Sequence, residues 1–119
     1  GEVVVQKLNG MFSFCIYDVT QKSLFLVRDR LGIKPLYYYG EGNHFIFASE
    51  IKSILLAHEV PKGVNPVAAR NYLQLRYIPD EETLFRGIKK LLPGNCLTLK
   101  DNKITLKQFW DVPLPKIKN

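Results

Sequence analysis

The sequence predicts an α+β fold in which helices flank a mainly antiparallel sheet. Two observations lead to this class. Within residues 11–48, polar turns separate four short segments rich in β-branched and aromatic residues, which is typical of antiparallel strands joined by hairpins. After Ala48 the apolar residues recur at a helical period instead.

The first of these segments, residues 11–18, carries apolar side chains on both faces, so we expect other layers to cover it on both sides. Three more strands are expected at residues 24–28, 36–39 and 45–48. Because tight turns join most of them, the four strands are predicted to form one antiparallel meander. In the run of three tyrosines at 37–39, alternation should bury either the central residue or its two neighbours.

Two helices are predicted after this meander. Ser49 is a good N-cap and Glu50 suits the first turn of a helix that should end near His58. Asn65 followed by proline predicts the N-cap and first position of a second helix, which should run to about residue 73.

The C-terminal third is predicted to end in a β-hairpin. Strands at residues 96–100 and 103–107 alternate in polarity, and Asp101-Asn102 between them forms a two-residue turn. Residues 83–91, which precede this hairpin, fit either a loop or a helical turn.

Length and charge restrict the class of protein. A chain of 119 residues suits one domain or part of one. No apolar run reaches the roughly 18 residues of a membrane helix and no signal peptide is evident, so we expect a cytoplasmic protein with no membrane partner. The net charge is +6, but the lysines are scattered, which argues against nucleic acid as a partner.

The cysteines and histidines suggest no metal site. Cys15 and Cys96 lie in neither a CxxC pair nor metal-ligand spacing, and we interpret both as small apolar residues of the sheet. The number of cysteines alone does not decide whether the two form a disulfide. His44 and His58 have no other ligand types spaced around them.

The segment Arg28-Asp29-Arg30 has two interpretations, an anion site or a structural ion pair. We favour the ion pair, because no glycine-rich phosphate loop opens a helix nearby. The Asp29 carboxylate is expected to pair with at least one guanidinium and to pin a turn around Gly32. Pro35 should stiffen the exit of that turn.

Lys34, which precedes Pro35, is expected to be a surface cation and not a catalytic amine. Trp110 should belong to the core or contact a further domain.

Five stretches of the sequence resemble asparagine synthetases in order. RDRLGIKPLYY at residues 28–38 resembles the RDRxGxKPLYY stretch of that family, LNGMFSF at 8–14 its LNGMFAF, and FASEIKSIL at 47–55 its FASEIKALL. LLPGN at 91–95 is similar to LPPGH, with Leu92 and Asn95 departing from it, and FWD at 109–111 is similar to YWD.

The resemblance implies the second half of a class II glutamine amidotransferase domain, an N-terminal-nucleophile hydrolase with an αββα sandwich. It also implies a parent ligase of asparagine biosynthesis that releases ammonia from glutamine and amidates aspartate with ATP and magnesium. Residues 1–111 would be the C-terminal half of the amidotransferase domain. Residues 112–119 would begin the linker to an ATP-dependent synthetase domain.

The family's catalytic residues do not carry over to this sequence. Gly1 stands first, where the family has a cysteine nucleophile, and an apolar stretch follows at once, so we expect the chain to begin inside a larger protein. The oxyanion Asn-Gly-Glu segment would precede the matched region, and Asn9-Gly10 is a different pair. The ATP loop would follow Asn119.

We therefore expect no catalytic, substrate-binding or metal residue in this chain, no cofactor bound to it, and no activity of the chain alone. We assign a structural role to eight residues of the RDRLGIKPLYY and FASEIKSIL stretches: Arg28, Asp29, Arg30, Gly32, Lys34, Pro35, Ser49 and Glu50. The expected partners are the N-terminal glutaminase half and the synthetase domain of the parent chain, and a homo-oligomer stays open.

Two alternatives remain at this point. One is a fragment of a related β-lactam-forming synthetase, which shares the architecture without a working glutaminase. The other is a free-standing basic module that binds RNA or an acidic protein.

Overall fold

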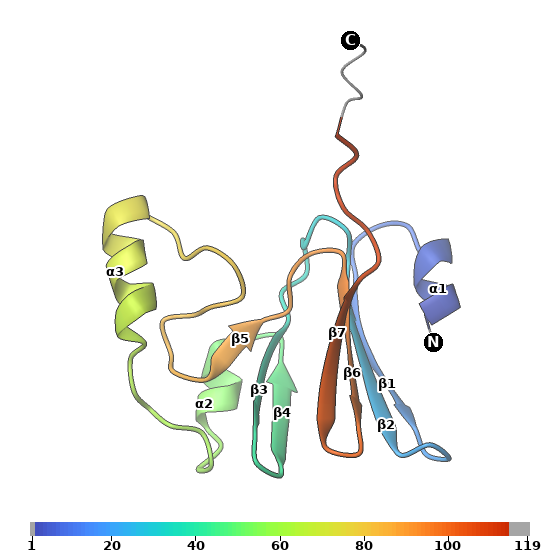
Figure 1. The fold of residues 1–119 in the computed structure, drawn as a ribbon, viewed down its shortest axis with the longest axis horizontal. Coiled ribbons are helices and arrows are strands. Elements are labelled where there is room, and N and C mark those ends of the chain that lie inside the picture. The colour runs from blue at the N-terminus through green and yellow to red at the C-terminus, as the bar shows by residue number, and fades with distance from the viewer. Residues whose placement is uncertain (1, 115–119) are drawn as a thin grey trace.

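The computed structural model describes residues 2–114, which form three α-helices and seven strands in two antiparallel sheets (Figure 1). The predicted α+β class with antiparallel sheets is confirmed. The elements in chain order are α1 (Glu2–Lys7), β1 (Ser13–Asp18), β2 (Ser23–Arg28), β3 (Tyr37–Glu41), β4 (His44–Ala48), α2 (Ile51–Leu55), α3 (Pro66–Leu75), β5 (Ile88–Lys90), β6 (Asn95–Lys100) and β7 (Lys103–Gln108). The end of the predicted linker, residues 115–119, lies outside the described residues.

The four predicted strands between residues 11 and 48 are present, but they do not form one meander. The four-stranded sheet has the order β1-β2-β6-β7, and the three-stranded sheet has the order β4-β3-β5. The connection from β2 to β3 therefore crosses between sheets. The reason is long-range pairing, because β6 takes the place beside β2 and β5 takes the place beside β3.

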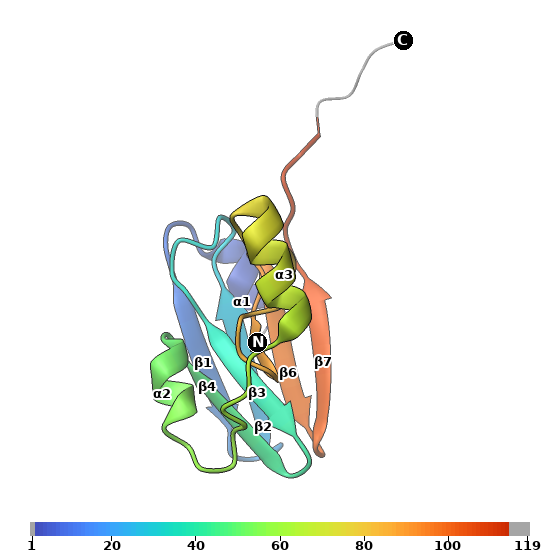
Figure 2. The same cartoon turned by 90° about the vertical axis from the view of Figure 1, so that its left-hand side faces the viewer.

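The two sheets pack face to face around an apolar cluster (Figures 1 and 2). Leu26 and Leu97 of the four-stranded sheet are fully buried there against Tyr38 of the three-stranded sheet. Gly40 shows how closely the sheets approach, because a Cβ built on it would lie 2.6 Å from Cδ1 of Ile104. A glycine is therefore favoured at this strand position.

Each sheet also carries a helix on its outer face. Val5 of α1 packs against Val27 and Cys96 on the four-stranded sheet. Ile54 of α2 packs against Tyr39 and other residues on the three-stranded sheet. The expected cover on both faces is present for residues 12–15, but Ile16 and Tyr17 are 43% and 57% exposed, so the second half of β1 is not covered. The packing buries two adjacent tyrosines, 38 and 39, where alternation alone predicted one set or the other.

The two cysteines lie on opposite faces of the same sheet and are not joined by a disulfide. Cys15 contacts the cluster between the sheets, and burial raises the pKa of its thiol. Cys96 faces α1, with its Sγ 3.5 Å from the Lys107 carbonyl oxygen. Both cysteines are sheet residues, as the sequence indicates.

The helix α2 differs from its prediction at both ends. Its N-cap is Glu50, not Ser49, and the Glu50 side chain forms no capping hydrogen bond but pairs with Lys52 at 2.9 Å. The helix ends at Leu55, before the expected His58. The Lys62 ammonium donates to the carbonyl oxygens of Leu55 and, at 2.8 Å, Ala57, so a side chain satisfies carbonyls that a longer helix would have bonded itself.

The start of α3 follows its prediction. Asn65 Oδ1 accepts hydrogen bonds from the N–H groups of Val67 (3.1 Å) and Ala68 (3.2 Å). The helix runs to Leu75, two residues beyond the expected end, and is closed by Arg76 in the left-handed conformation (φ 64°). Ala68 is its one fully buried residue, and α3 lies to one side of the two sheets (Figure 1).

Residues 63–86, called here the α3 excursion, leave the sheets as one segment, and backbone pairing joins its two ends. Val64 and Phe85 form a β-bridge, the N–H of Asn65 donates to the Leu84 carbonyl at 2.8 Å, and that of Arg86 donates to Gly63 at 2.9 Å. Residues 63 and 86 thus lie side by side although the chain between them forms a helix and a long loop.

The last hairpin is confirmed and one strand was missed. Asp101 and Asn102 have φ values of 49° and 60°, as a two-residue type I′ turn requires. Residues 88–90, for which a loop or a helical turn was predicted, form β5 because β3 offers them a pairing edge. The short helix α1 had no sequence prediction. No helix within residues 2–114 is long and apolar enough to cross a membrane.

Replacing Leu97 with alanine is expected to lower the free energy of unfolding by about 2–5 kcal/mol, because it leaves a cavity between the sheets. Leu106 is the matched control, since it lies opposite Leu97 on β7 but is 46% exposed, so Leu106→Ala should cost less than half as much. Urea denaturation of the polypeptide that carries this chain measures both. Equal losses would contradict the packing described here.

Candidate functional site

The carboxylate of Asp29 organises the turn between β2 and β3. Only 1% of this residue is exposed. Its Oδ1 accepts hydrogen bonds from the N–H groups of Leu31 (3.2 Å) and Ile33 (3.0 Å), and its Oδ2 accepts from the N–H of Lys34 (3.0 Å). The Asp29 carboxylate thus accepts hydrogen bonds from three backbone N–H groups, as the carbonyl groups of a neighbouring strand would in a sheet.

The pKa of Asp29 reflects two opposing effects. Burial alone would raise the pKa of this carboxyl. The backbone N–H groups of Lys34, Ile33, Phe12 and Leu31 lower it by more, so the pKa of Asp29 lies below its ordinary value. The charged form is thus the one that the fold selects.

The predicted ion pair is wrong, while the predicted pinning of the turn is confirmed. No guanidinium within the described residues lies within 4 Å of the Asp29 carboxylate. Arg28 donates instead to the carbonyl oxygens of Leu91 (2.7 Å), Gly32 (2.8 Å) and Lys34 (2.9 Å). The reason is that the turn presents its N–H groups to the carboxylate and its carbonyl groups to the guanidinium.

Arg30 turns toward the N-terminal segment. Its Nη1 donates to Asn9 Oδ1 at 3.1 Å and its Nη2 to the Gln6 carbonyl at 3.5 Å. Its Nε is buried and has no hydrogen-bond partner among the described residues. A buried donor without a partner is uncommon in a folded domain.

A second turn, residues 91–94, packs against the first. The Gly94 N–H donates to the Asp29 carbonyl at 2.9 Å, and the Gly32 N–H donates to the same oxygen at 3.1 Å. Gly32 has a φ of 66°, and a Cβ there would lie 2.5 Å from Cγ of Pro93. Both conformation and space therefore require glycine at this position.

An apolar hollow of about 290 Å³ opens beside the Asp29 turn. Met11, Leu31, Ile33 and Trp110 line it together with Gly10 and Arg30. The side chains of Met11, Leu31 and Ile33 are 64%, 68% and 53% exposed, so three apolar residues gather on an open surface instead of in a core.

The other motif residues do not join this hollow. Lys34 and Pro35 are exposed, and only the backbone of Lys34 takes part in the turn. Ser49 and Glu50 lie at the start of α2, on the three-stranded sheet. The structure thus groups Arg28, Asp29, Arg30, Gly32 and the backbone of Lys34 at the turn, and leaves Ser49 and Glu50 apart.

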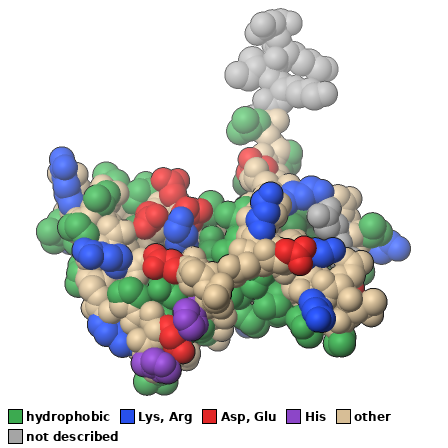
Figure 3. Space-filling view, turned by 60° about the horizontal axis from the view of Figure 1, so that its bottom comes forward, with side chains coloured by type: hydrophobic (Ala, Val, Ile, Leu, Met, Phe, Trp, Pro, Cys, Tyr) green, Lys and Arg blue, Asp and Glu red, His purple; other side chains and the backbone are tan. Residues whose placement is uncertain are grey.

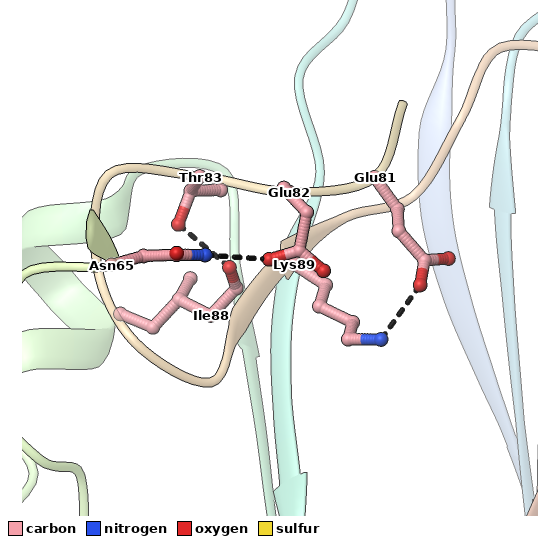
Figure 4. Close-up of polar contacts among 6 residues, drawn as sticks. All are labelled: Asn65, Glu81, Glu82, Thr83, Ile88 and Lys89. Atoms are coloured by element: carbon pink, nitrogen blue, oxygen red, sulfur yellow. Dashed lines mark hydrogen bonds and ion pairs between the residues drawn. The ribbon is translucent and has the colours of Figure 1, made fainter. Parts of the chain in front are cut away.

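The sequence analysis missed a second polar cluster, in the loop after α3 (Figure 4). Asn65 Nδ2 donates to Glu82 Oε2 at 2.8 Å, and Lys89 Nζ lies 2.6 Å from Glu81 Oε1. The buried hydroxyl of Thr83 lies 2.6 Å from the Ile88 carbonyl oxygen. The neighbouring carboxylates at 81 and 82 and the two lysines at 89 and 90 were the available signal, but only the β5 pairing brings them together.

Basic side chains do not form a continuous patch on the face that Figure 3 shows. Lysines and arginines there are scattered, with acidic and apolar side chains between them. A nucleic-acid groove would instead concentrate positive charge with exposed aromatic residues.

A comparison with protein-family models matches residues 1–110 to the family described as glutamine amidotransferase domain. The chain belongs to this family. The Asp29 turn and the residues that line the hollow all fall within the matched region, whose last residue is Trp110.

Curated relatives of this amidotransferase chain are several times longer. It is 35% identical over 116 residues to asparagine synthetase (glutamine-hydrolyzing) 3 of Bacillus subtilis, covering 97% of this chain and 19% of the relative. It is 36% identical over 110 residues to asparagine synthetase (glutamine-hydrolyzing) 1 of the same organism, covering 92% and 17%. It is 32% identical over 112 residues to amidase chry2 of Gibberella zeae, covering 93% and 16%. The chain thus spans less than a fifth of the length of these relatives.

Replacing Asp29 with asparagine is expected to lower the free energy of unfolding by about 1.5–3 kcal/mol at neutral pH, because an NH₂ group would then face a backbone N–H. The folded-state pKa is below the ordinary value of 3.8, so the stabilisation by the carboxylate is complete above about pH 4 and is lost as the pH falls through the folded-state pKa. Urea denaturation across this range should show the difference between the two proteins shrinking.

Asp18 is the matched control for this substitution. Its Oδ1 also accepts two backbone N–H groups, from Thr20 and Gln21 at 2.9 Å, but the residue is exposed. Asp18→Asn should therefore cost less. A difference at Asp29 that is independent of pH, or no larger than that at Asp18, would contradict the role assigned to the buried carboxylate.

Proposed function

We propose that this chain is the C-terminal half of the class II glutamine amidotransferase domain in a glutamine-hydrolysing asparagine synthetase. The parent enzyme would hydrolyse glutamine to ammonia and use that ammonia to amidate aspartate. The family match over residues 1–110, together with 35% and 36% identity to two asparagine synthetases, is the observation that carries this proposal.

Within the parent, this chain would supply framework and not chemistry. The nucleophile, the oxyanion segment and the ATP loop of the family have no counterpart at matching positions of this sequence. We assign ATP and magnesium to the synthetase domain of the parent for the same reason. The side chains of Arg28 and Asp29 bond backbone groups of the turn, as structural groups do.

The hollow beside the Asp29 turn would be part of an inter-domain surface. Its exposed apolar residues would be covered by another part of the parent chain. Arg30 Nε, buried at this site without a partner among the described residues, would find an acceptor there. Trp110 lines the same hollow, next to the segment that would lead into the linker.

The sheet edges support the assignment to an αββα sandwich. β7 carries Lys103 and Lys107, and β5 is only three residues long, which protects both edges from pairing with another chain. The opposite edges, β1 and β4, contain no lysine, arginine or proline. We infer that strands of the glutaminase half extend both sheets at β1 and β4.

Two other functions have weaker support. A related β-lactam-forming synthetase would share this framework, and the sequence upstream would distinguish it by the presence or absence of a cysteine nucleophile. A free-standing basic module lacks a concentrated positive patch on the face shown in Figure 3.

The purified chain is expected to release no ammonia from glutamine above a blank without protein, whereas the whole polypeptide with its preceding segment should release it. A coupled ammonia assay on both proteins makes the comparison. Ammonia release by the chain alone would overturn the proposal. Its absence from the whole polypeptide, despite a cysteine at the mature N-terminus, would do the same.

The isolated chain is expected to self-associate through the open edges of β1 and β4. Replacing Ile16 and Phe47, which are 43% and 37% exposed, with lysine should shift it toward the monomer, because charge on an edge opposes strand pairing. Sedimentation velocity measures the shift, with Thr105→Lys on the protected strand β7 as the control. A wild-type chain that is monomeric at all concentrations would contradict the inference about its edges.

A further inference from the structure

A cleft of about 450 Å³ lies between α3, the loop that follows it and the three-stranded sheet. This volume is within the range of small-molecule sites in proteins. Four aromatic side chains line it, from Tyr37 on β3, Tyr72 on α3, and Tyr77 and Phe85 in the loop. None of the described contacts engages the three tyrosine hydroxyls, so the cleft offers flat apolar walls with polar edges.

Two cations line the same cleft. Lys90 donates one hydrogen bond, to the Ile78 carbonyl at 2.8 Å, and no carboxylate of the described residues lies within 4 Å of its ammonium. Burial, and then the positive charge of Arg28, lower the pKa of Lys90, while Asp80 opposes them. Arg76 likewise forms no ion pair within the part of the chain that the structure describes. A half-buried cation without a carboxylate partner is stabilised by a bound anion.

The acidic group of the cleft is already engaged. Glu82 is the one carboxylate among the lining residues, and its Oε2 accepts from Asn65 Nδ2 at 2.8 Å. Figure 4 shows this pair beside the bond between Thr83 and the Ile88 carbonyl. These contacts hold the loop wall and direct Glu82 Oε2 toward Asn65, so Lys90 and Arg76 are the lining groups that can pair with an anion.

Arg76 occupies a backbone conformation that favours glycine. Its φ of 64° closes α3, where an arginine is less stable than a glycine would be. An arginine side chain at this position lies in the lining of the cleft.

We propose that this cleft binds a small molecule with a planar aromatic ring and one anionic group, a carboxylate or a phosphate. The ring stacks among Tyr37, Tyr72 and Phe85, and the anion pairs with Lys90 and Arg76. This site is separate from the Asp29 turn and its hollow, and it does not depend on the proposed glutaminase role.

The test is isothermal titration of the whole polypeptide, as the cell makes it, with benzoate, phenyl phosphate and neutral benzamide. At least one of the two anions should bind saturably, roughly tenfold or more tightly than benzamide. Tighter binding of benzoate assigns a carboxylate ligand, and tighter binding of phenyl phosphate assigns a phosphate ligand. Binding of neither anion, or equal binding of benzamide, would overturn the proposal.

Variants locate the binding within the cleft. Lys90→Met keeps the aliphatic stem and removes the charge, so it should weaken anion binding roughly tenfold. Lys103→Met, on exposed β7 outside the cleft, is the matched control and should bind as the wild type does. Arg76→Gln and Tyr72→Ala change exposed residues and give the same test if Lys90→Met fails to fold. Unchanged affinity in folded variants of all three cleft residues would show that the anion binds elsewhere and would refute the site.

Discussion

The arrangement of the two sheets depends on one buried carboxylate. Asp29 lies where the chain leaves β2 for the other sheet, and its side chain holds three N–H groups of the departing turn. Its backbone N–H donates to the carbonyl of Phe12, just before β1, and its carbonyl accepts from the N–H of Gly94, in the turn before β6. A buried ionised group is stable only when such donors surround it, so turn and carboxylate stabilise each other.

The sequence predicts those parts of the fold that local alternation and local caps determine. Asn65 caps α3 and Asp101-Asn102 turns the last hairpin because both act on residues beside them in the chain. Sheet membership was not predictable in this way. Val27 pairs with Cys96 and Tyr39 with Ile88, and such distant pairs are chosen by packing and not by local propensity.

The candidate sites show the same division. The Asp29 turn was predicted, but its bonding was not, because alternation gives the side on which a carboxylate lies and not which donors the next turn presents. The cleft was not predicted at all. Tyr37, Tyr72 and Lys90 come from three separate elements, and nothing in their spacing along the chain indicates that they share a wall. The family resemblance, by contrast, rests on short ordered motifs that the sequence shows directly.

The β-bridge at the base of the α3 excursion has an evolutionary consequence. Val64 and Phe85 hold the two ends of this segment together. The positions of these two ends relative to the sheets therefore do not depend on the residues between them. The entropic cost of closing such a loop grows only slowly with its length. Insertions and deletions between the anchors would therefore leave the two sheets in place, so this segment can change length without altering the framework.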